Sequence, residues 1–262
     1  MRYAIAIWNY TEPDVPLPRL VSEFADFGYD TISFSSGQFG DRAAPEMRET
    51  AALIRDRGLG VTLHCAFDFG AEGVRHVLDL FGEAVLAVTF DPLAEVDSCG
   101  SSFATGRMAP VLAEILRHTE GSALRVAIED LPLDARALDH YRADLGPLLG
   151  DRYGMLLDVG HLNMRLRRWS YFAGLSIADY ITGIPVPIVE AHLHDNHGEG
   201  DQHAPLGFGN LDFAAVAEGL KLAGFDGVST VEIAPTFHGS TPAESKPHSQ
   251  ASLAQWKALW GR

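Results

Sequence analysis

The chain has 262 residues, of which 47% are hydrophobic, and this is enough apolar material for the core of one large domain. Its formal net charge at pH 7 is −15. Such an acidic chain disfavours nucleic acid and anionic membranes as partners, because both require basic side chains on one face. Two cysteines, Cys65 and Cys99, argue against a disulfide framework, and because we find no signal peptide and no apolar run near ~20 residues, we expect a cytoplasmic protein without membrane spans.

Short apolar runs recur along the chain and predict strands. There are eight of them, at residues 3–8, 30–36, 60–67, 84–90, 124–130, 153–159, 187–195 and 227–233. Stretches with helical periodicity lie between them, for example 44–57, 72–82, 107–119 and 211–224. The starts of the runs are on average about 32 residues apart, which is the size of one βα unit. Residues 235–249 are rich in proline and serine and are predicted to form a loop before a last helix.

This alternation predicts an α/β fold. Near-continuous apolar strands separated by helices are typical of a parallel sheet covered by helices, and eight such units predict a single (β/α)₈ TIM barrel over residues 1–262. An open, doubly wound sheet is the alternative. It is less favoured, because the first βα turn lacks the G-x-G-x-x-G pattern of dinucleotide-binding folds.

Side chains that can bind metal ions lie at or beyond the ends of six of the eight runs. In a TIM barrel the ends of the strands meet at the face that carries the active site. Each such residue alone is more often a helix cap or a hydrogen-bonded core histidine, but their agreement across six strands favours one common site. The nine candidates are His64, Asp91, Glu129, Asp158, His161, His192, Asp201, His203 and Glu232.

Charge supports a metal centre at this face. Five carboxylates in one mouth repel one another, and only three residues of the chain are lysines, so divalent cations are the natural compensation. Mixed imidazole and carboxylate ligands suit zinc, manganese or iron. We expect one primary site, with a second or third ion left open. In the loop after the seventh run, Asp201 and His203 would form a second position with His161, or else hydrogen-bond to each other and hold the loop.

All nine candidates except Asp91 lie in six short motifs. These are "TLHC" in the third run, "IED" in the fifth, "LLDVGHL" at the end of the sixth, "HLHDN" at the end of the seventh, "DQH" in the loop that follows it, and "TVEI" in the eighth. In these motifs the chain resembles the xylose isomerase-like TIM-barrel superfamily, which includes sugar phosphate isomerases and epimerases and the endonuclease IV-like AP endonuclease family 2. The resemblance implies that Glu129, Asp158, His192 and Glu232 hold one divalent metal and that the two glutamates move a proton. In the endonuclease branch the wider set binds three zinc ions, with a histidine at the position of Asp91.

The function predicted from these observations is that of a divalent-metal-dependent isomerase or epimerase. Its substrate would be a sugar, a polyol or a related small hydroxy-carbonyl compound, converted through a metal-stabilised enediolate with Glu129 and Glu232 as acid and base. We expect His161 to polarise a substrate oxygen. The predicted substrate contacts are Trp8, Phe67, His194 and Phe208.

Two other functions remain open at this point. A multinuclear metal phosphoesterase, acting on abasic-site DNA or on a small phosphorylated compound, would use the same residues. The acidic charge and the short basic run 165–169 disfavour the DNA substrate. A non-catalytic metal-binding barrel is the third possibility. The expected partner is a small molecule, and a homo-oligomer is left open.

Overall fold

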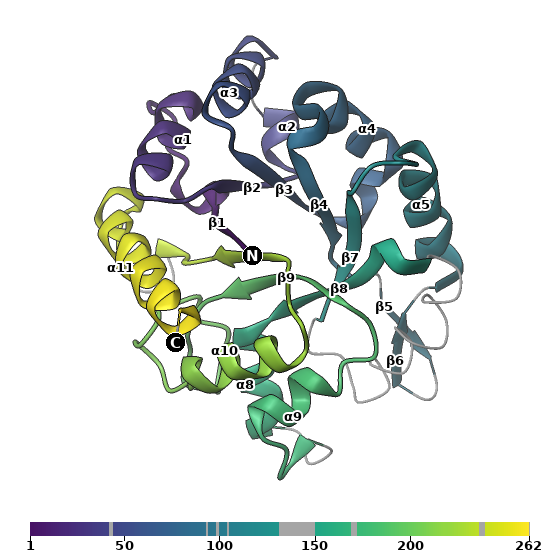
Figure 1. Ribbon diagram of the computed structural model, residues 1–262, viewed down its shortest axis with the longest axis vertical. Helices are drawn as coiled ribbons and strands as arrows, with labels where there is room; N and C mark the ends of the chain where they lie inside the picture. Colours follow the sequence, from purple (N-terminus) through teal and green to yellow (C-terminus); the bar gives the residue numbers. More distant parts are fainter. Residues whose placement is uncertain are drawn as a thin grey trace.

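A computed structural model describes residues 1–41, 44–92, 94–97, 100–103, 105–130, 150–168, 172–235 and 239–261. Eight parallel strands close into a barrel in the order β1-β10-β9-β8-β7-β4-β3-β2 (Figure 1). They are β1 (Arg2–Ala6), β2 (Thr31–Ser35), β3 (Gly60–Cys65), β4 (Val85–Phe90), β7 (Arg125–Glu129), β8 (Tyr153–Asp158), β9 (Ile188–Leu193) and β10 (Val228–Val231). Each coincides with one predicted apolar run. The (β/α)₈ barrel is therefore confirmed, and the open-sheet alternative is wrong.

Helices form a ring around the barrel (Figure 1). They are α1 (Leu17–Asp26), α2 (Gln38–Asp41), α3 (Ala44–Arg57), α4 (Gly70–Phe81), α5 (Thr105–His118), α8 (Val159–Arg168), α9 (Ile177–Thr182), α10 (Phe213–Leu222) and α11 (Pro242–Trp260). The four helices predicted by periodicity are confirmed. In α1, for example, Leu20, Val21 and Phe24 are fully buried against the strands, as the spacing of one apolar face requires. Among the described residues, no helix combines the length and apolar character needed to cross a bilayer.

Two local features differ from the sequence-based expectation. The predicted loop 235–249 is wrong for its second half, because α11 begins at Pro242. Thr241 and Glu244 form a capping box there, and proline is favoured in a first helical turn. A short antiparallel pair, β5 (Ala94–Asp97) and β6 (Gly100–Phe103), was not predicted. Cys99 and Trp169 lie outside the described residues, and the other cysteine, Cys65, is buried and free.

The inside of the barrel is lined by small and polar side chains. The register pairs Ser33 with Thr62, and Thr230 with His192. A hydrogen bond of 2.9 Å between the Thr62 hydroxyl on β3 and Glu190 on β9 crosses the lumen between strands on opposite sides of the barrel. Since side chains alternate along a strand, Glu190, His192 and His194 all lie on the inner side of the chain at β9. This alternation directs the polar residues of β9 toward the mouth.

Candidate metal centre

Asp158 is the central carboxylate of the candidate site. It ends β8, where its Oδ1 accepts a hydrogen bond of 2.8 Å from the backbone N–H of His161 in the first turn of α8. Asp158 forms one group of potential metal ligands with His192 and Glu232, and another with Glu129 and His161. Within each group the ligand atoms lie within 4.8 Å of one another. The four residues predicted for the primary metal are thus brought together around Asp158.

A third group lies beside Glu129 and is formed by His64, Asp91 and Glu129. His64, on β3, places its Nε2 3.2 Å from Oδ1 of Asp91 and 3.4 Å from Oε2 of Glu129. Its Nδ1 lies 3.0 Å from the hydroxyl of Thr89. The Thr89 hydroxyl contacts Nδ1, so Nε2 of His64 is the ring nitrogen that faces the two carboxylates. Asp91 is therefore placed to act as a metal ligand together with His64 and Glu129.

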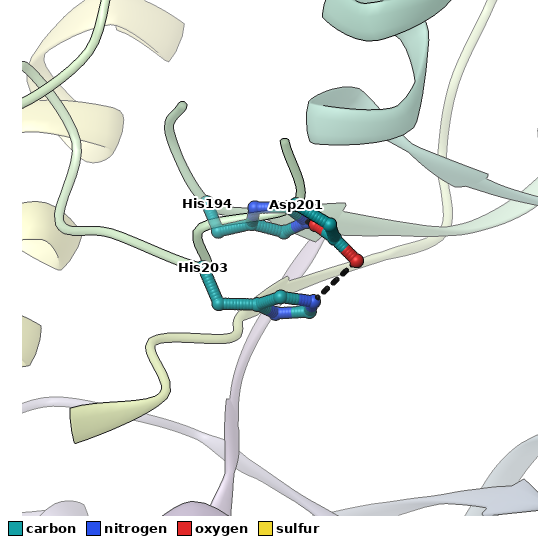
Figure 2. Close-up of side chains that lie close together, drawn as sticks. All are labelled: His194, Asp201 and His203. Atoms are coloured by element: carbon teal, nitrogen blue, oxygen red, sulfur yellow. Dashed lines mark hydrogen bonds and ion pairs between the residues drawn. The ribbon is translucent and has the colours of Figure 1, made fainter. Parts of the chain in front are cut away.

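The fourth group, His194, Asp201 and His203, is formed by the end of β9 and the loop that follows it. Oδ2 of Asp201 lies 3.1 Å from Nε2 of His203 and 3.2 Å from Nε2 of His161. Figure 2 shows the rings of His194 and His203 lying face to face, with Asp201 at the edge of His203. The chain turns here through Gly198 and through His203 itself, which both have positive φ angles, 81° and 43°. Both arrangements expected for Asp201 and His203 are compatible with this geometry, since the aspartate contacts both histidines.

Protons on histidine balance the acidic charge of the metal-free site. Burial opposes the charged form of His161, but Asp158, Asp201 and Glu129 raise its pKa to about 12. Burial also opposes the imidazolium of His203, yet Glu232, Asp201 and Asp158 raise its pKa to about 9. The pKa of His192 is raised well above its ordinary value by Glu232 and Glu190, again against desolvation.

The carboxylates respond in the opposite sense. Burial favours the protonated form of Glu232, but His192 and His203 lower its pKa to about 2. The pKa of Asp158 is held well below its ordinary value, because His161 and His194 outweigh the cost of burial. Hydrogen bonds from His161 and His203 likewise lower the pKa of Asp201. Without a metal, the site is therefore a network of neighbouring imidazolium and carboxylate groups. The protons on the histidines supply the positive charge that a bound cation would supply.

The residues present fit divalent metal ions. Four groups of three nitrogen or oxygen ligands occur among the described residues, and histidine contributes to each of them. Imidazole with carboxylate suits zinc, manganese or iron. Glu129 and Asp158 each belong to two of these groups. A carboxylate shared in this way could serve two neighbouring ions.

The predicted substrate contacts lie in different surroundings. Trp8 stacks on His64 and lies at an angle to His192, with ring centroids 6.0 and 6.3 Å apart. Phe67 packs edge-on against Phe90 and against the core. Phe208 is 53% exposed and contacts His197, outside the four ligand groups. His194 is fully buried, and its Nε2 lies 2.9 Å from Oδ1 of Asp158. Trp8 is therefore the aromatic residue that directly borders the candidate ligands.

Several supporting residues were not identified from the sequence. Arg165, which belongs to the predicted basic run, is buried and pairs with Asp130, whose Oδ1 accepts the backbone N–H of Asp158 at 2.8 Å. Asp195 accepts the backbone N–H groups of residues 196, 207, 209 and 211, and so holds both ends of the loop that contains Asp201. Glu190 lies inside the barrel below His192. The alternation of side chains along β9 was the one signal that could have indicated Glu190.

Residues 21–256 match the family model described as "Xylose isomerase-like TIM barrel". The chain belongs to this family. The site described above therefore lies at the carboxyl ends of the strands of a xylose isomerase-like barrel.

Individual relatives are distant or matched over part of their length. An uncharacterized protein of Methanocaldococcus jannaschii, MJ1311, is 30% identical over 127 residues, which are 46% of this chain and 41% of that protein. The chain thus spans about two fifths of the curated relative it matches. A D-allulose 3-epimerase from Methylomonas sp., solved in complex with D-allulose, has a TM-score of 0.70 at 14% identity, with 99% of this chain and 97% of that chain covered. The IOLI protein, solved with a zinc atom, has a TM-score of 0.67 at 16% identity, with 100% and 98% covered.

Proposed function

We propose that this protein is a divalent-metal-dependent isomerase or epimerase of a sugar, a polyol or a related small hydroxy-carbonyl compound. The observation that carries the proposal is the arrangement of Glu129 and Glu232 around Asp158. They come from β7 and β10, which are not neighbours in the barrel. Two carboxylates that reach one site from different strands can act on different sides of a bound substrate. The epimerase and the zinc-containing protein with the same fold support this reading.

The metal would be held by Glu129, Asp158, His192 and Glu232. When bound, a divalent cation polarises a substrate carbonyl and its neighbouring hydroxyl, which makes the adjacent C–H group more acidic. One of the two glutamates removes that proton and the other returns a proton to the neighbouring position or to the opposite face. Burial of both side chains keeps bulk water away from the proton being moved.

Two further side chains have defined parts in this scheme. His161 places Nδ1 3.2 Å from Oε1 of Glu129, so it orients that carboxylate and can hydrogen-bond to a substrate oxygen beside it. Trp8 presents a flat apolar ring beside His64 and His192. The C–H face of a sugar can pack against such a ring. Together they would fix the substrate relative to Glu129.

A second candidate function is phosphoester hydrolysis. It is favoured by a specific observation, namely that His64 and Asp91 on one side, and Asp201 and His203 on the other, provide more ligand atoms than one metal needs. Several metal ions would activate water and neutralise a phosphate. The net charge of −15 favours a small phosphorylated substrate over DNA. We also propose that the protein is cytoplasmic and that its substrate is a small molecule.

Proton exchange with solvent distinguishes these functions. The protein, loaded with manganese or zinc, is incubated in D₂O with a panel of free and phosphorylated ketoses and polyol-derived ketones, followed by NMR. The expected result is exchange of the C–H beside the carbonyl, with formation of an isomer or epimer. A parallel panel of small phosphoesters and an abasic-site duplex is followed by phosphate or strand release. Hydrolysis of the second panel without exchange in the first would overturn the isomerase proposal.

A further inference from the structure

We propose that Glu190 is a positioning residue of the metal centre. Its carboxylate, inside the barrel below the site, holds the imidazole of His192 so that Nδ1 faces the metal and Nε2 carries the proton. The inference rests on the proposed metal site at Glu129, Asp158, His192 and Glu232, and extends it by a residue that is not itself a ligand.

Glu190 is anchored to the opposite wall of the barrel. Its side chain is fully buried, and its Oε1 accepts a hydrogen bond of 2.9 Å from the hydroxyl of Thr62 and another from the hydroxyl of Thr230. The hydroxyl of Thr62 also lies 2.7 Å from that of Ser33. Three strands besides β9 thus contribute hydroxyl groups to this network. A side chain held from both sides of the lumen has little freedom to move, so it provides a fixed reference point for its neighbours.

The ring of His192 lies between Glu190 and the ligand group. Its Nδ1 is 2.7 Å from Oε2 of Glu232. Its Nε2 is buried, makes no hydrogen bond with a described residue, and lies 3.7 Å from Oε1 of Glu190, just beyond hydrogen-bond distance. A neutral imidazole that binds a metal through one nitrogen carries its proton on the other. An acceptor for that N–H fixes the ring orientation and makes the ligand more basic, and carboxylates are common acceptors. Glu190 is the carboxylate on the Nε2 side.

A purely structural role explains Glu190 poorly. A carboxyl group inside a barrel is costly unless donors or a cation compensate it, and an apolar side chain of similar size often stabilises a core as well or better. Oε2 of Glu190 makes no hydrogen bond with any described residue. Both donors on Oε1 are neutral hydroxyls, and the basic side chain beside that oxygen is the imidazole of His192.

Metal affinity is the first test. The dissociation constant for zinc or manganese is measured by competition with a chelating indicator for wild type, Glu190→Leu, Glu190→Gln and Thr50→Ala. We expect Glu190→Leu to bind metal about 10–100-fold more weakly, as is typical when such a supporting carboxylate is lost. Glu190→Gln keeps an acceptor but not its charge and should lie between Leu and wild type. Thr50→Ala removes a buried hydroxyl on α3, outside the network around Glu190, and should bind as wild type.

A second readout reports on the ring itself. In long-range ¹H–¹⁵N spectra of the zinc-loaded wild type, His192 should show a protonated Nε2 whose proton exchanges slowly with solvent. In Glu190→Leu and Glu190→Gln this exchange should be faster, while circular dichroism stays native. If Glu190→Leu does not fold, Glu190→Gln becomes the decisive variant. We then expect a loss of metal affinity near the lower end of the range given above, together with faster exchange of the Nε2 proton.

The outcomes separate the two proposals. A wild-type protein that binds no zinc or manganese would overturn the metal centre and with it the proposed function. A wild type that binds metal, with unchanged affinity and unchanged Nε2 exchange in the folded Glu190 variants, would overturn the positioning role alone. A loss of affinity in Thr50→Ala equal to that in Glu190→Gln would also overturn it, because the effect would then follow from the loss of any buried polar group.

Discussion

Nε2 of His194 lies 2.9 and 3.0 Å from the two carboxylate oxygens of Asp158. His194 therefore supports the central carboxylate of the site from behind, while the face of its ring stacks on His203 with centroids 3.9 Å apart (Figure 2). We predict that His194→Phe, which keeps a ring for stacking but has no N–H, weakens metal binding about 10–100-fold. Isothermal titration of zinc into the metal-free protein measures the effect.

The matched control for this variant is His197→Phe, at an exposed position in the following loop. It should bind metal as wild type. Gly160→Ala provides an independent check, because a Cβ there would fall 2.0 Å from Cε1 of His194 and displace the ring. Wild-type affinity in both His194→Phe and Gly160→Ala would remove His194 from the support of Asp158.

Glu129→Gln should abolish turnover without unfolding the protein. The amide has nearly the same shape but cannot accept a proton, so we predict a loss of about 10²–10⁴-fold in the rate of C–H exchange on the substrate identified by the ketose panel. Glu218→Gln, an exposed glutamate on α10, is the control and should keep the wild-type rate. Exchange at the wild-type rate in Glu129→Gln would exclude Glu129 as acid or base.

Sequence patterns predicted the barrel, and they predicted that the candidate ligand residues lie close together, for a physical reason. Strand-sized apolar runs and helical periodicity are local properties, and the carboxyl ends of all strands in such a barrel meet at one face. His64 and Glu232, at opposite ends of the chain, could thus be assigned to one site. Pairings set by packing alone were missed. Arg165 was seen only as part of a short basic run, and its burial against Asp130 depends on residues 35 positions apart. The start of α11 was missed because proline and serine occur both in loops and in first helical turns.

Removing Asp201 and His203 together should lower the number of metal ions that the protein holds. Both residues lie in the fourth ligand group, with His194, apart from the four residues of the proposed primary site. Elemental analysis of protein purified without chelator should show more than one ion per chain for wild type, and one fewer for the Asp201→Ala, His203→Ala double variant.

The control for the metal count is the His197→Ala, Glu199→Ala double variant, which changes two exposed residues of the same loop. It should keep the wild-type number of ions. One ion per chain in both wild type and the Asp201, His203 variant would refute the second metal position. The contact of 3.1 Å between the two residues would then serve to hold the loop.

Metal binding and folding should respond to pH in opposite directions. The pKa of His203 is raised from 6.5 to about 9 in the folded, metal-free protein. The folded state then holds a proton that the unfolded state has lost, so this stabilisation is complete below pH 6.5 and disappears as the pH rises through 9. A metal ligand must be the neutral imidazole, so metal affinity should increase over the same interval as the proton becomes easier to displace.

Thermal unfolding of the metal-free protein and titration calorimetry across this interval test the pH prediction. The melting temperature should fall and zinc affinity should rise, with proton release detected in buffers of different ionisation enthalpy. In His203→Gln both slopes should be smaller. A metal-free protein that becomes more stable from pH 6.5 to 9 would contradict the assignment of these protons.

Much of the site depends on the alternation of side chains along one short strand. Glu190 and His192 on β9 and His194 just beyond it alternate with Ala191 and Leu193, which are buried in the outer apolar cluster under the helices. A shift of this segment by a single residue would exchange the two faces, placing alanine and leucine in the mouth and three ionisable groups in the apolar layer. Insertions and deletions within 188–194 should therefore be far more damaging than point substitutions there. Among homologues, we expect the length of this segment to vary less than the identity of its outward-facing residues.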